Sequence, residues 1–320
     1  MNSYVGSKLI LVEGLTGSGK SIMAHTIARQ LAHNGIPATW VHEGELPHPL
    51  GIEDDPGAEG YAVYMRRQWA TYVEHVAQSN QVSVVEACLF NNVFEWLFAL
   101  DWDREDILGY ADEMQTLLAP LNPTLVYLAQ EDVDAALVRN FDRRGVGFRD
   151  YVIDYATDTA IAKHRGWTGY DGMAKFWREF VSLTDELYER YHIHKCKIDN
   201  AAGQWPDYDR QVMDCLALPF VPEPRLSQSE AIKLVGSYKD RQSDKVFTVL
   251  YEDGKLTIDL FLETRTTLVP RPNGIFETAG WHFEIRFELD AGDESTVFII
   301  GGRDVEYLTL VGTVADKVRA

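Results

Sequence analysis

The sequence has few cysteines, no long uncharged segment and a shortage of basic residues. Its three cysteines, Cys88, Cys196 and Cys215, lack the spacing of a metal site, and so sparse a set is typical of a reducing compartment. No uncharged stretch reaches the eighteen or so residues that span a bilayer. The apolar run near the N-terminus fits a first strand better than a secretion signal. We therefore expect a soluble, cytoplasmic protein with no membrane partner.

The charge balance narrows the range of partners. Lys and Arg number 30 against 49 Asp and Glu among 320 residues, a formal net charge of −19. Nucleic-acid polymers and anionic membranes need a basic face, so this balance argues against both. It does not argue against a nucleotide, which needs only a local positive site. The length favours two domains, each able to bury its own core.

Apolar strands alternate with helical patterns over residues 1–217. The sequence predicts strands at 8–13, 38–42, 82–86, 124–128 and 194–198, and helices at 21–33, 60–78, 106–118, 131–140 and 171–191. This alternation is typical of an α/β fold, a parallel sheet with helices on both faces. Such sheets bind ligands at the carboxyl ends of their strands.

The pattern changes after residue 217. Residues 218–225 contain three prolines, which predicts an extended linker. In residues 226–320, strands at 246–251 and 255–260 flank a hairpin signal, Glu252-Asp253-Gly254, and a second turn follows at 272–274. Further strands are predicted at 282–288, 296–300 and 307–311. We expect an antiparallel all-β domain, a sandwich or a barrel. It contains no evident catalytic cluster, and it is compatible with a substrate pocket, a homodimer contact or a partner-binding surface.

One motif carries most of the chemical information. Residues 14–21 read Gly-Leu-Thr-Gly-Ser-Gly-Lys-Ser and fit G-x-x-x-x-G-K-[ST], with a predicted strand before them and a predicted helix after them. In this pattern the lysine reaches the β- and γ-phosphates and the final hydroxyl binds Mg²⁺. We expect ATP phosphates to be bound by Gly14, Leu15, Thr16, Gly17, Ser18, Gly19, Lys20 and Ser21.

The same loop serves several classes of protein, and most of them need a second motif. The Asn-Lys-x-Asp of GTPases and the Leu-Ser-Gly-Gly of ABC ATPases are both missing. Hydrolytic motors usually end the relevant strand in adjacent acids, whereas one glutamate, Glu86, ends the predicted strand here. A kinase is the class that remains.

Acidic and basic residues near the predicted strand ends complete the candidate site. Glu86 fits a ligand of Mg²⁺, held directly or through water together with Ser21. Glu43 or Glu45 fits a proton acceptor for a substrate hydroxyl; the alternative is a solvated acidic loop made of Glu43, Glu45, Glu53, Asp54 and Asp55.

Arginines gather in one segment of this acidic chain. Arg139, Arg143, Arg144 and Arg149 fall within eleven residues, and Arg143 and Arg144 precede Gly145-Val146-Gly147. We interpret this segment as a mobile lid with glycine hinges whose arginines neutralise the transferring phosphoryl group. A charged helix end paired with Asp142 and Asp150 is the alternative.

Two weaker signals concern the substrates. Asn91, Asn92, Phe94, Trp96 and Phe98 follow the third predicted strand and fit an acceptor pocket, although an apolar helix against the sheet explains the aromatic residues equally well. Residues 198–203 follow the last strand of the sheet, a position suited to the adenine ring.

Four stretches of the first 205 residues resemble the thymidylate kinase and deoxynucleoside kinase branch of the P-loop kinases. They are residues 12–21 with the phosphate loop, 40–45 with an acid after the second strand, 84–86 with the third-strand acid, and 123–128 followed by 132–145. The resemblance implies a magnesium-dependent ATP kinase in which Glu43 faces the substrate and an arginine-bearing lid covers the phosphates. The chain departs from the branch at Ala87-Cys88, where an arginine usually follows the acid.

These observations lead to two hypotheses from different classes. The first is an ATP- and Mg²⁺-dependent phosphotransferase whose acceptor is a nucleoside, a nucleotide or another small hydroxyl compound. Its catalytic residues are expected to be Lys20, Glu86, Glu43, Arg143, Arg144 and Arg139. The second is a non-catalytic nucleotide-binding switch or scaffold whose β domain engages a protein partner.

Overall fold

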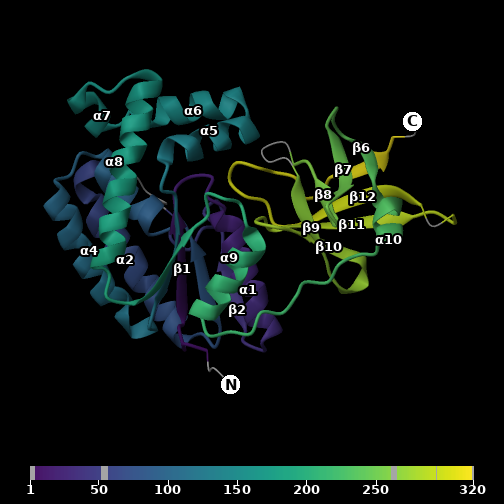
Figure 1. Cartoon of the computed structure of the whole chain (residues 1–320), viewed down its shortest axis with the longest axis horizontal. Coiled ribbons are helices and arrows are strands. Elements are labelled where there is room, and N and C mark those ends of the chain that lie inside the picture. The colour runs from purple at the N-terminus through teal and green to yellow at the C-terminus, as the bar shows by residue number, and fades with distance from the viewer. Residues whose placement is uncertain (1–3, 52–56, 261–264, 293, 319–320) are drawn as a thin grey trace. The chain divides into compact units, whose positions relative to one another are not determined.

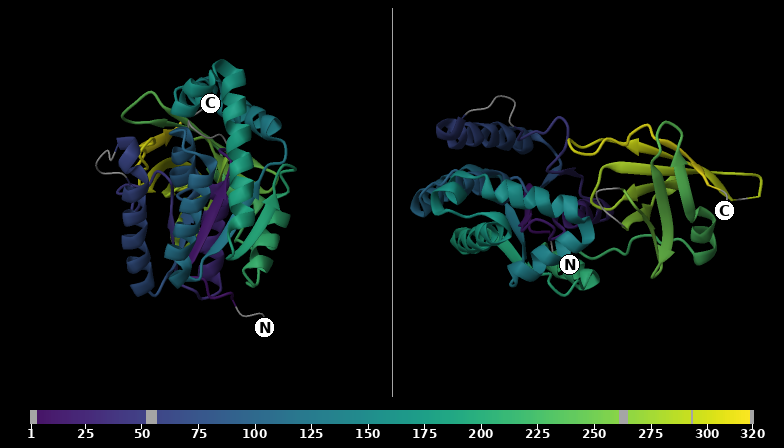
Figure 2. Two further views of the ribbon diagram at one scale, coloured as in Figure 1. Left: turned by 90° about the vertical axis from the view of Figure 1, so that its left-hand side faces the viewer. Right: turned by 90° about the horizontal axis from the view of Figure 1, so that it is seen from above.

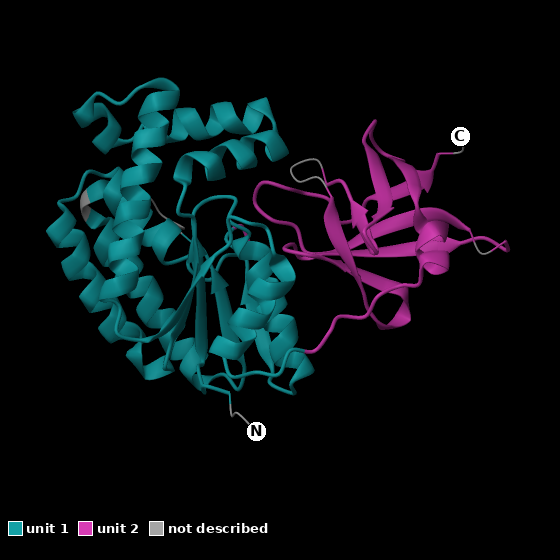
Figure 3. Cartoon of the chain, in the orientation of Figure 1, with its two compact units in different colours: residues 1–43, 47–220 teal, residues 44–46, 221–320 magenta. Residues whose placement is uncertain are grey.

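The computed structural model describes residues 4–51, 57–260, 265–292 and 294–318 of the chain. These residues form two compact units, coloured separately in Figure 3. Residues 1–43 and 47–220 belong to the first unit, and residues 44–46 and 221–320 to the second.

The first unit is built around a parallel five-stranded sheet with the order β2-β3-β1-β4-β5 (Figure 1). Its strands are β1 (Leu9–Gly14), β2 (Ala38–Val41), β3 (Val82–Glu86), β4 (Thr124–Ala129) and β5 (His194–Asp199). The three central strands β3, β1 and β4 are buried along their whole length, which explains their largely apolar sequences. Because the strands are parallel, their carboxyl ends meet at one edge of the sheet.

Helices cover both faces of this sheet (Figures 1 and 2). Ile10 and Val12 of β1 pack in one hydrophobic cluster with α1 (Lys20–His33) and α9 (Trp205–Cys215). Leu9 and Leu11 point to the opposite face and pack in a second cluster, as the two-residue period of a strand requires. That second cluster includes α2 (Gly57–Gln78), α4 (Arg104–Leu118) and α8 (Gly169–Arg190). The short elements η1 (Phe90–Phe94, a π-helix), α3 (Glu95–Ala99) and η2 (Ala119–Leu121) connect β3 to β4.

The helices between β4 and α8 correct one prediction. They are α5 (Val133–Arg144), α6 (Val146–Thr157) and α7 (Ala160–Arg165). The loop predicted at 143–147 is wrong, because Arg143 and Arg144 end α5 while Val146 and Gly147 begin α6. Gly145 alone joins the two helices, and packing of α6 against α8 explains why this segment is helical.

The second unit is a closed antiparallel barrel. Around the barrel the strand order is β10-β11-β12-β13-β6-β7-β8-β9, and pairing of β9 with β10 closes it. Its centre is filled by side chains, among them Tyr238 and Phe247, whose rings both contact Phe298. The strands are β6 (Gly236–Asp240), β7 (Val246–Glu252), β8 (Lys255–Ile258), β9 (Thr266–Pro270), β10 (Ile275–Thr278), β11 (Phe283–Leu289), β12 (Ser295–Gly302) and β13 (Val314–Lys317).

Two short helices accompany the barrel. The 3₁₀ helix η3 (Pro272–Gly274) forms the predicted turn between β9 and β10. Helix α10 (Gln228–Leu234) begins at a capping box, in which the Ser227 and Glu230 side chains each accept a backbone N–H of the other residue.

The strand predicted at 307–311 is wrong. The carboxylate of Asp304 accepts hydrogen bonds from the backbone N–H groups of Leu310 (2.6 Å) and Val311 (2.9 Å). These hydrogen bonds compete with pairing to a neighbouring strand, which would need the same backbone N–H groups. The last described strand of the barrel is β13 instead.

The predicted fold class, α/β followed by an all-β domain, is confirmed, and the β domain is a barrel rather than a sandwich. Within the described residues, every helix is either too short or too polar to cross a bilayer.

Candidate functional site

The Gly14–Ser21 loop joins β1 to α1 at the carboxyl edge of the sheet. Each of its three glycines has a positive φ angle and close neighbours. A Cβ atom on Gly14 (φ 154°) would lie 2.5 Å from the backbone oxygen of Leu128, and one on Gly19 (φ 87°) would collide with the indole ring of Trp205. The backbone of the loop is therefore held in a shape that only glycine permits at these positions.

Lys20 and Ser21 occupy the first positions of α1. The Lys20 ammonium is buried, with 6 % of the residue exposed, and donates a hydrogen bond to the backbone oxygen of Leu15 at 3.2 Å. The Ser21 hydroxyl donates to Oε1 of Glu86 at 2.6 Å. The loop and the carboxyl end of β3 are thus joined through the two residues that the sequence assigned to a metal.

Glu86 lies fully buried at the end of β3. Its second carboxylate oxygen, Oε2, has no hydrogen-bond partner in the described part of the chain. Burial raises the pKa of Glu86 and repulsion from Glu43 adds to that rise, while the Lys20 charge opposes it. Glu43 follows β2, is exposed, and is close enough to act on Glu86 through its charge.

Of the other acidic residues weighed for the proton acceptor, Glu45 belongs to the second unit. There its carboxylate forms an ion pair with Arg303 and lies 3.4 Å from Nε2 of His282. This carboxylate is therefore engaged by two groups of the barrel unit. Glu53, Asp54 and Asp55 lie outside the described residues.

Glu13 is a buried acid that sequence reasoning missed. Its carboxylate accepts the backbone N–H of Leu89 at 2.8 Å, just before η1. Burial raises its pKa to about 8, opposed by that hydrogen bond and by the Lys20 charge. Its unusual place at the end of the apolar run Leu9–Val12 was the available signal, because a buried carboxylate in such a run needs a specific partner.

Glu95 is the second buried acid that was missed. Its carboxylate accepts hydrogen bonds from the Tyr155 hydroxyl (2.7 Å) and from Nδ2 of Asn91 (3.3 Å). Burial raises the pKa of Glu95 to about 7, with both hydrogen bonds and the Lys20 charge acting in the opposite direction. A lone glutamate between Phe94 and Trp96 was the only trace of this site in the sequence.

A chain of hydrogen bonds connects Arg139 to the Gly14–Ser21 loop. Arg139 donates to Oε1 of Gln130 at 2.7 Å, Gln130 donates to Oδ1 of Asn200, and Asn200 donates to the backbone oxygen of Ser18. Gln130 and Asn200 are buried at the ends of β4 and β5. The arginine predicted for the lid thus reaches the loop through two amide side chains, and Asn200 lies in the segment predicted to adjoin adenine.

Arg143 and Arg144 end α5, whereas Arg149 lies in α6 and pairs with Asp150 at 2.9 Å. A Cβ atom on Gly17 would collide with the side chain of Asn140, so this face of α5 lies against the Gly14–Ser21 loop. Arg144 is four residues further and therefore on the same face, one turn away. Its guanidinium stacks over the ring of Phe148 at 4.7 Å, and its buried Nε has no hydrogen-bond partner in the described part of the chain. Arg143 is exposed at the helix end.

The Ser21–Glu86 pair fits a hard cation such as Mg²⁺. Hydroxyl and carboxylate oxygens are the ligands that this ion prefers, and a buried Oε2 without a partner would gain one from it. No group of three or more His, Cys, Asp or Glu residues among the described positions is arranged to hold a metal. Mg²⁺ held mainly by water, phosphates and one carboxylate needs no such group.

Comparisons with known proteins give little further information. No protein-family model matches the sequence, and no curated protein matches it. Among solved structures, the chain is similar to the YorR protein of Bacillus subtilis in complex with phosphorylated GDP, at 13 % sequence identity and a TM-score of 0.35. The match covers 64 % of this chain and 94 % of that one.

Proposed function

We propose that this protein is an ATP- and Mg²⁺-dependent kinase that phosphorylates a hydroxyl group of a small acceptor, with nucleosides and nucleotides as the leading class. The observation that carries the proposal is the Ser21–Glu86 hydrogen bond beside the buried Lys20. It joins the phosphate-loop motif to an acid at the end of the neighbouring strand, which is the pairing that metal-bound triphosphate requires.

Each residue has a distinct part in this proposal. The backbone of the Gly14–Ser21 loop and the Lys20 ammonium would hold the phosphates, and Ser21 with Glu86 would hold the metal. Bound Mg²⁺ATP would supply the phosphoryl group and neutralise much of its charge. Glu43 would accept the proton of the acceptor hydroxyl at its exposed carboxylate. Arg139, Arg143 and Arg144 would offset negative charge near the transferring group.

The proposal is tested first at the nucleotide. We expect a fluorescent ATP analogue with Mg²⁺ to bind the full chain and Lys20→Ala to weaken that binding at least tenfold, since the variant removes the buried cation of the loop. Lys175→Ala, an exposed lysine on α8, is the matched control and should leave binding unchanged. Equal binding by all three proteins would rule out the loop as the nucleotide site.

The switch hypothesis also predicts nucleotide binding, but no transfer of phosphate to a small molecule. A phosphorylated product that forms with the wild-type protein but not with Lys20→Ala would therefore support the kinase and contradict the switch.

A further inference from the structure

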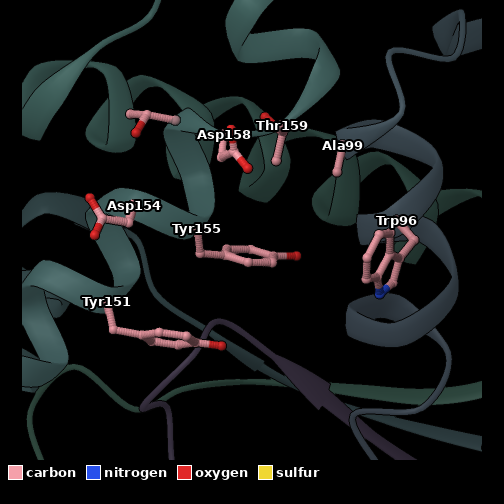
Figure 4. Close-up of a pocket in the computed structure, with 8 residues that line it drawn as sticks. Trp96, Ala99, Tyr151, Asp154, Tyr155, Asp158 and Thr159 are labelled. Carbon is pink, nitrogen blue, oxygen red and sulfur yellow. The ribbon is translucent and has the colours of Figure 1, made fainter.

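A pocket of about 680 Å³ lies between α3, α6 and the start of α7 (Figure 4). Figure 4 shows the rings of Tyr151 and Tyr155 pointing toward the side where Trp96 lies. None of the pocket's lining residues belongs to the Gly14–Ser21 loop, so this is a separate recess of the first unit. Of the segment predicted to form an acceptor pocket, Trp96 lines it, whereas Phe94 and Phe98 are buried in the core.

The aromatic side chains of the pocket suit a planar ligand. Tyr151 and Tyr155 stack with their ring centroids 6.5 Å apart and an interplanar angle of 26°. Tyr151 is 64 % exposed and Trp96 is 41 % exposed, on opposite sides of the recess. Large aromatic surfaces left open on the two sides of one recess mark a place where a ring can be enclosed.

The charges of the pocket are of one sign. Asp154 and Asp158 line it, and the described lining residues include no lysine, arginine or histidine. Asp158 already pairs with Lys163 at 2.7 Å, whereas no ion pair involves Asp154 in the described part of the chain. A phosphate group there would meet negative charge with no guanidinium or ammonium to pair with it. Carboxylates instead accept hydrogen bonds from amino groups.

The pocket is connected to the candidate catalytic residues. The Tyr155 ring lines it, and the Tyr155 hydroxyl donates to Glu95, whose buried carboxylate interacts electrostatically with Lys20 and Glu43. In addition, α5 lies against the Gly14–Ser21 loop at Gly17, and α6, which follows after one residue, supplies Tyr151, Asp154 and Tyr155. A ring bound in the pocket would therefore be held by α6, which follows directly on the helix that lies against the Gly14–Ser21 loop.

We propose that this pocket holds the base of the acceptor and that this base bears an exocyclic amino group. The inference rests on the proposed function and narrows its acceptor class. The open rings select a planar group, and Asp154 selects a hydrogen-bond donor on that group.

Equilibrium titration of the full chain with matched ligand pairs tests this inference. We expect cytidine to bind at least tenfold more tightly than uridine, which lacks the amino group, and adenosine to bind more tightly than inosine, which also lacks it. Tyr151→Ala and Asp154→Asn should each weaken cytidine binding about tenfold, by loss of the ring contact and of the negative charge that strengthens the hydrogen bond from the amino group. Asp150→Asn is the control, because Asp150 lies on the same helix but pairs with Arg149 outside the lining.

Several results would overturn the inference. They are uridine binding as tight as cytidine binding, no binding of any nucleoside, or nucleoside binding that neither Tyr151→Ala nor Asp154→Asn weakens. The titrations are run with and without a non-hydrolysable ATP analogue and Mg²⁺. If the analogue binds but cytidine and uridine bind equally, the acceptor inference fails and the kinase proposal stands. If the analogue does not bind, the kinase proposal fails, while titration of the free protein still decides what the pocket binds.

Discussion

At the scale of single residues, the site gathers buried carboxylates around one buried cation. Glu13, Glu86 and Glu95 are each buried, and the Lys20 charge favours the ionised form of all three. One ammonium does not offset three desolvated carboxylates, so burial prevails and raises the pKa of each. An added divalent cation would favour the ionised carboxylates, so its binding should release protons from this site.

Glu13 gives a prediction about stability and pH. Its folded-state pKa of about 8 is above its ordinary value of 4.5, so the folded chain binds the proton more tightly than the unfolded chain. Stability from this group is present below about pH 4.5 and is lost as pH rises toward 8, at about 1.4 kcal/mol per pKa unit. We expect Glu13→Gln, which keeps the acceptor for Leu89 but cannot ionise, to reduce that loss.

The measurement is the free energy of unfolding by urea at pH 5.5 and pH 8.5 for both proteins. Wild type should lose more stability than Glu13→Gln between the two pH values. Identical losses would show that Glu13 does not ionise in this interval.

The Ser21–Glu86 pair gives a prediction about the metal. If both residues hold Mg²⁺, Ser21→Ala and Glu86→Gln should each raise the Mg²⁺ concentration for half-maximal nucleotide binding or transfer by about 10–100-fold, the effect usual for lost ligand support. Glu113→Gln is a control, because Glu113 forms an exposed ion pair with Arg66. An unchanged Mg²⁺ dependence in Glu86→Gln would show that Glu86 does not hold the metal.

Part of the site could be predicted from sequence order alone. The motif fixes Lys20 and Ser21, and Glu86 follows from its place at the end of a buried strand. Glu13 and Glu95 could not be assigned in this way, since their roles depend on partners distant in the chain: Leu89 for Glu13 and Tyr155 for Glu95. The relay from Arg139 to Ser18 likewise depends on β4 and β5 being neighbours.

At the scale of elements, the junction of α5 and α6 places one helix against the Gly14–Ser21 loop and the other along the pocket. Gly145 alone makes this junction, with φ 86° and ψ 179°. A Cβ atom there would meet no atom within 4 Å, so backbone strain is the only obstacle to a side chain. A residue with a side chain would have to adopt a conformation that is accessible almost only to glycine.

Two glycines of this segment form a matched pair. Gly145→Ala should lower the free energy of unfolding by about 1–3 kcal/mol through backbone strain. Gly147→Ala, inside α6 and also in open space, should raise it by up to about 1 kcal/mol, since alanine favours the helix. Thermal unfolding of both variants checks the signs, and stabilisation by Gly145→Ala would contradict the described junction.

Elements with an uninterrupted pattern were predictable, and those that depend on tertiary packing were not. The bounds predicted for β3, 82–86, agree with the structure because a fully buried strand shows as one apolar run. Helix α6 was interpreted as a loop because Gly145 and Gly147 suggested a hinge. Its neighbour α8 stabilises it, which a single-sequence pattern does not reveal.

At the scale of the whole molecule, each unit has hydrophobic clusters of its own. Two clusters belong to the first unit, and a third, within the barrel, belongs to the second. All residues proposed to bind nucleotide lie in the first unit. Chains with separate cores commonly depart from two-state unfolding.

This separation predicts the outcome of calorimetry on the full chain. We expect two thermal transitions, with Mg²⁺ATP raising the midpoint of only one by mass action at the first unit. Lys20→Ala should abolish that shift without removing either transition. A single transition that moves as a whole with Mg²⁺ATP would show that the two units unfold together.

The most direct test of the kinase proposal is transfer of the γ-phosphate from labelled ATP, with Mg²⁺, to separate nucleosides and their monophosphates. We predict a labelled product with adenosine, cytidine or their monophosphates, and none with Lys20→Ala. ATP binding without any labelled acceptor would contradict the kinase and favour the nucleotide switch.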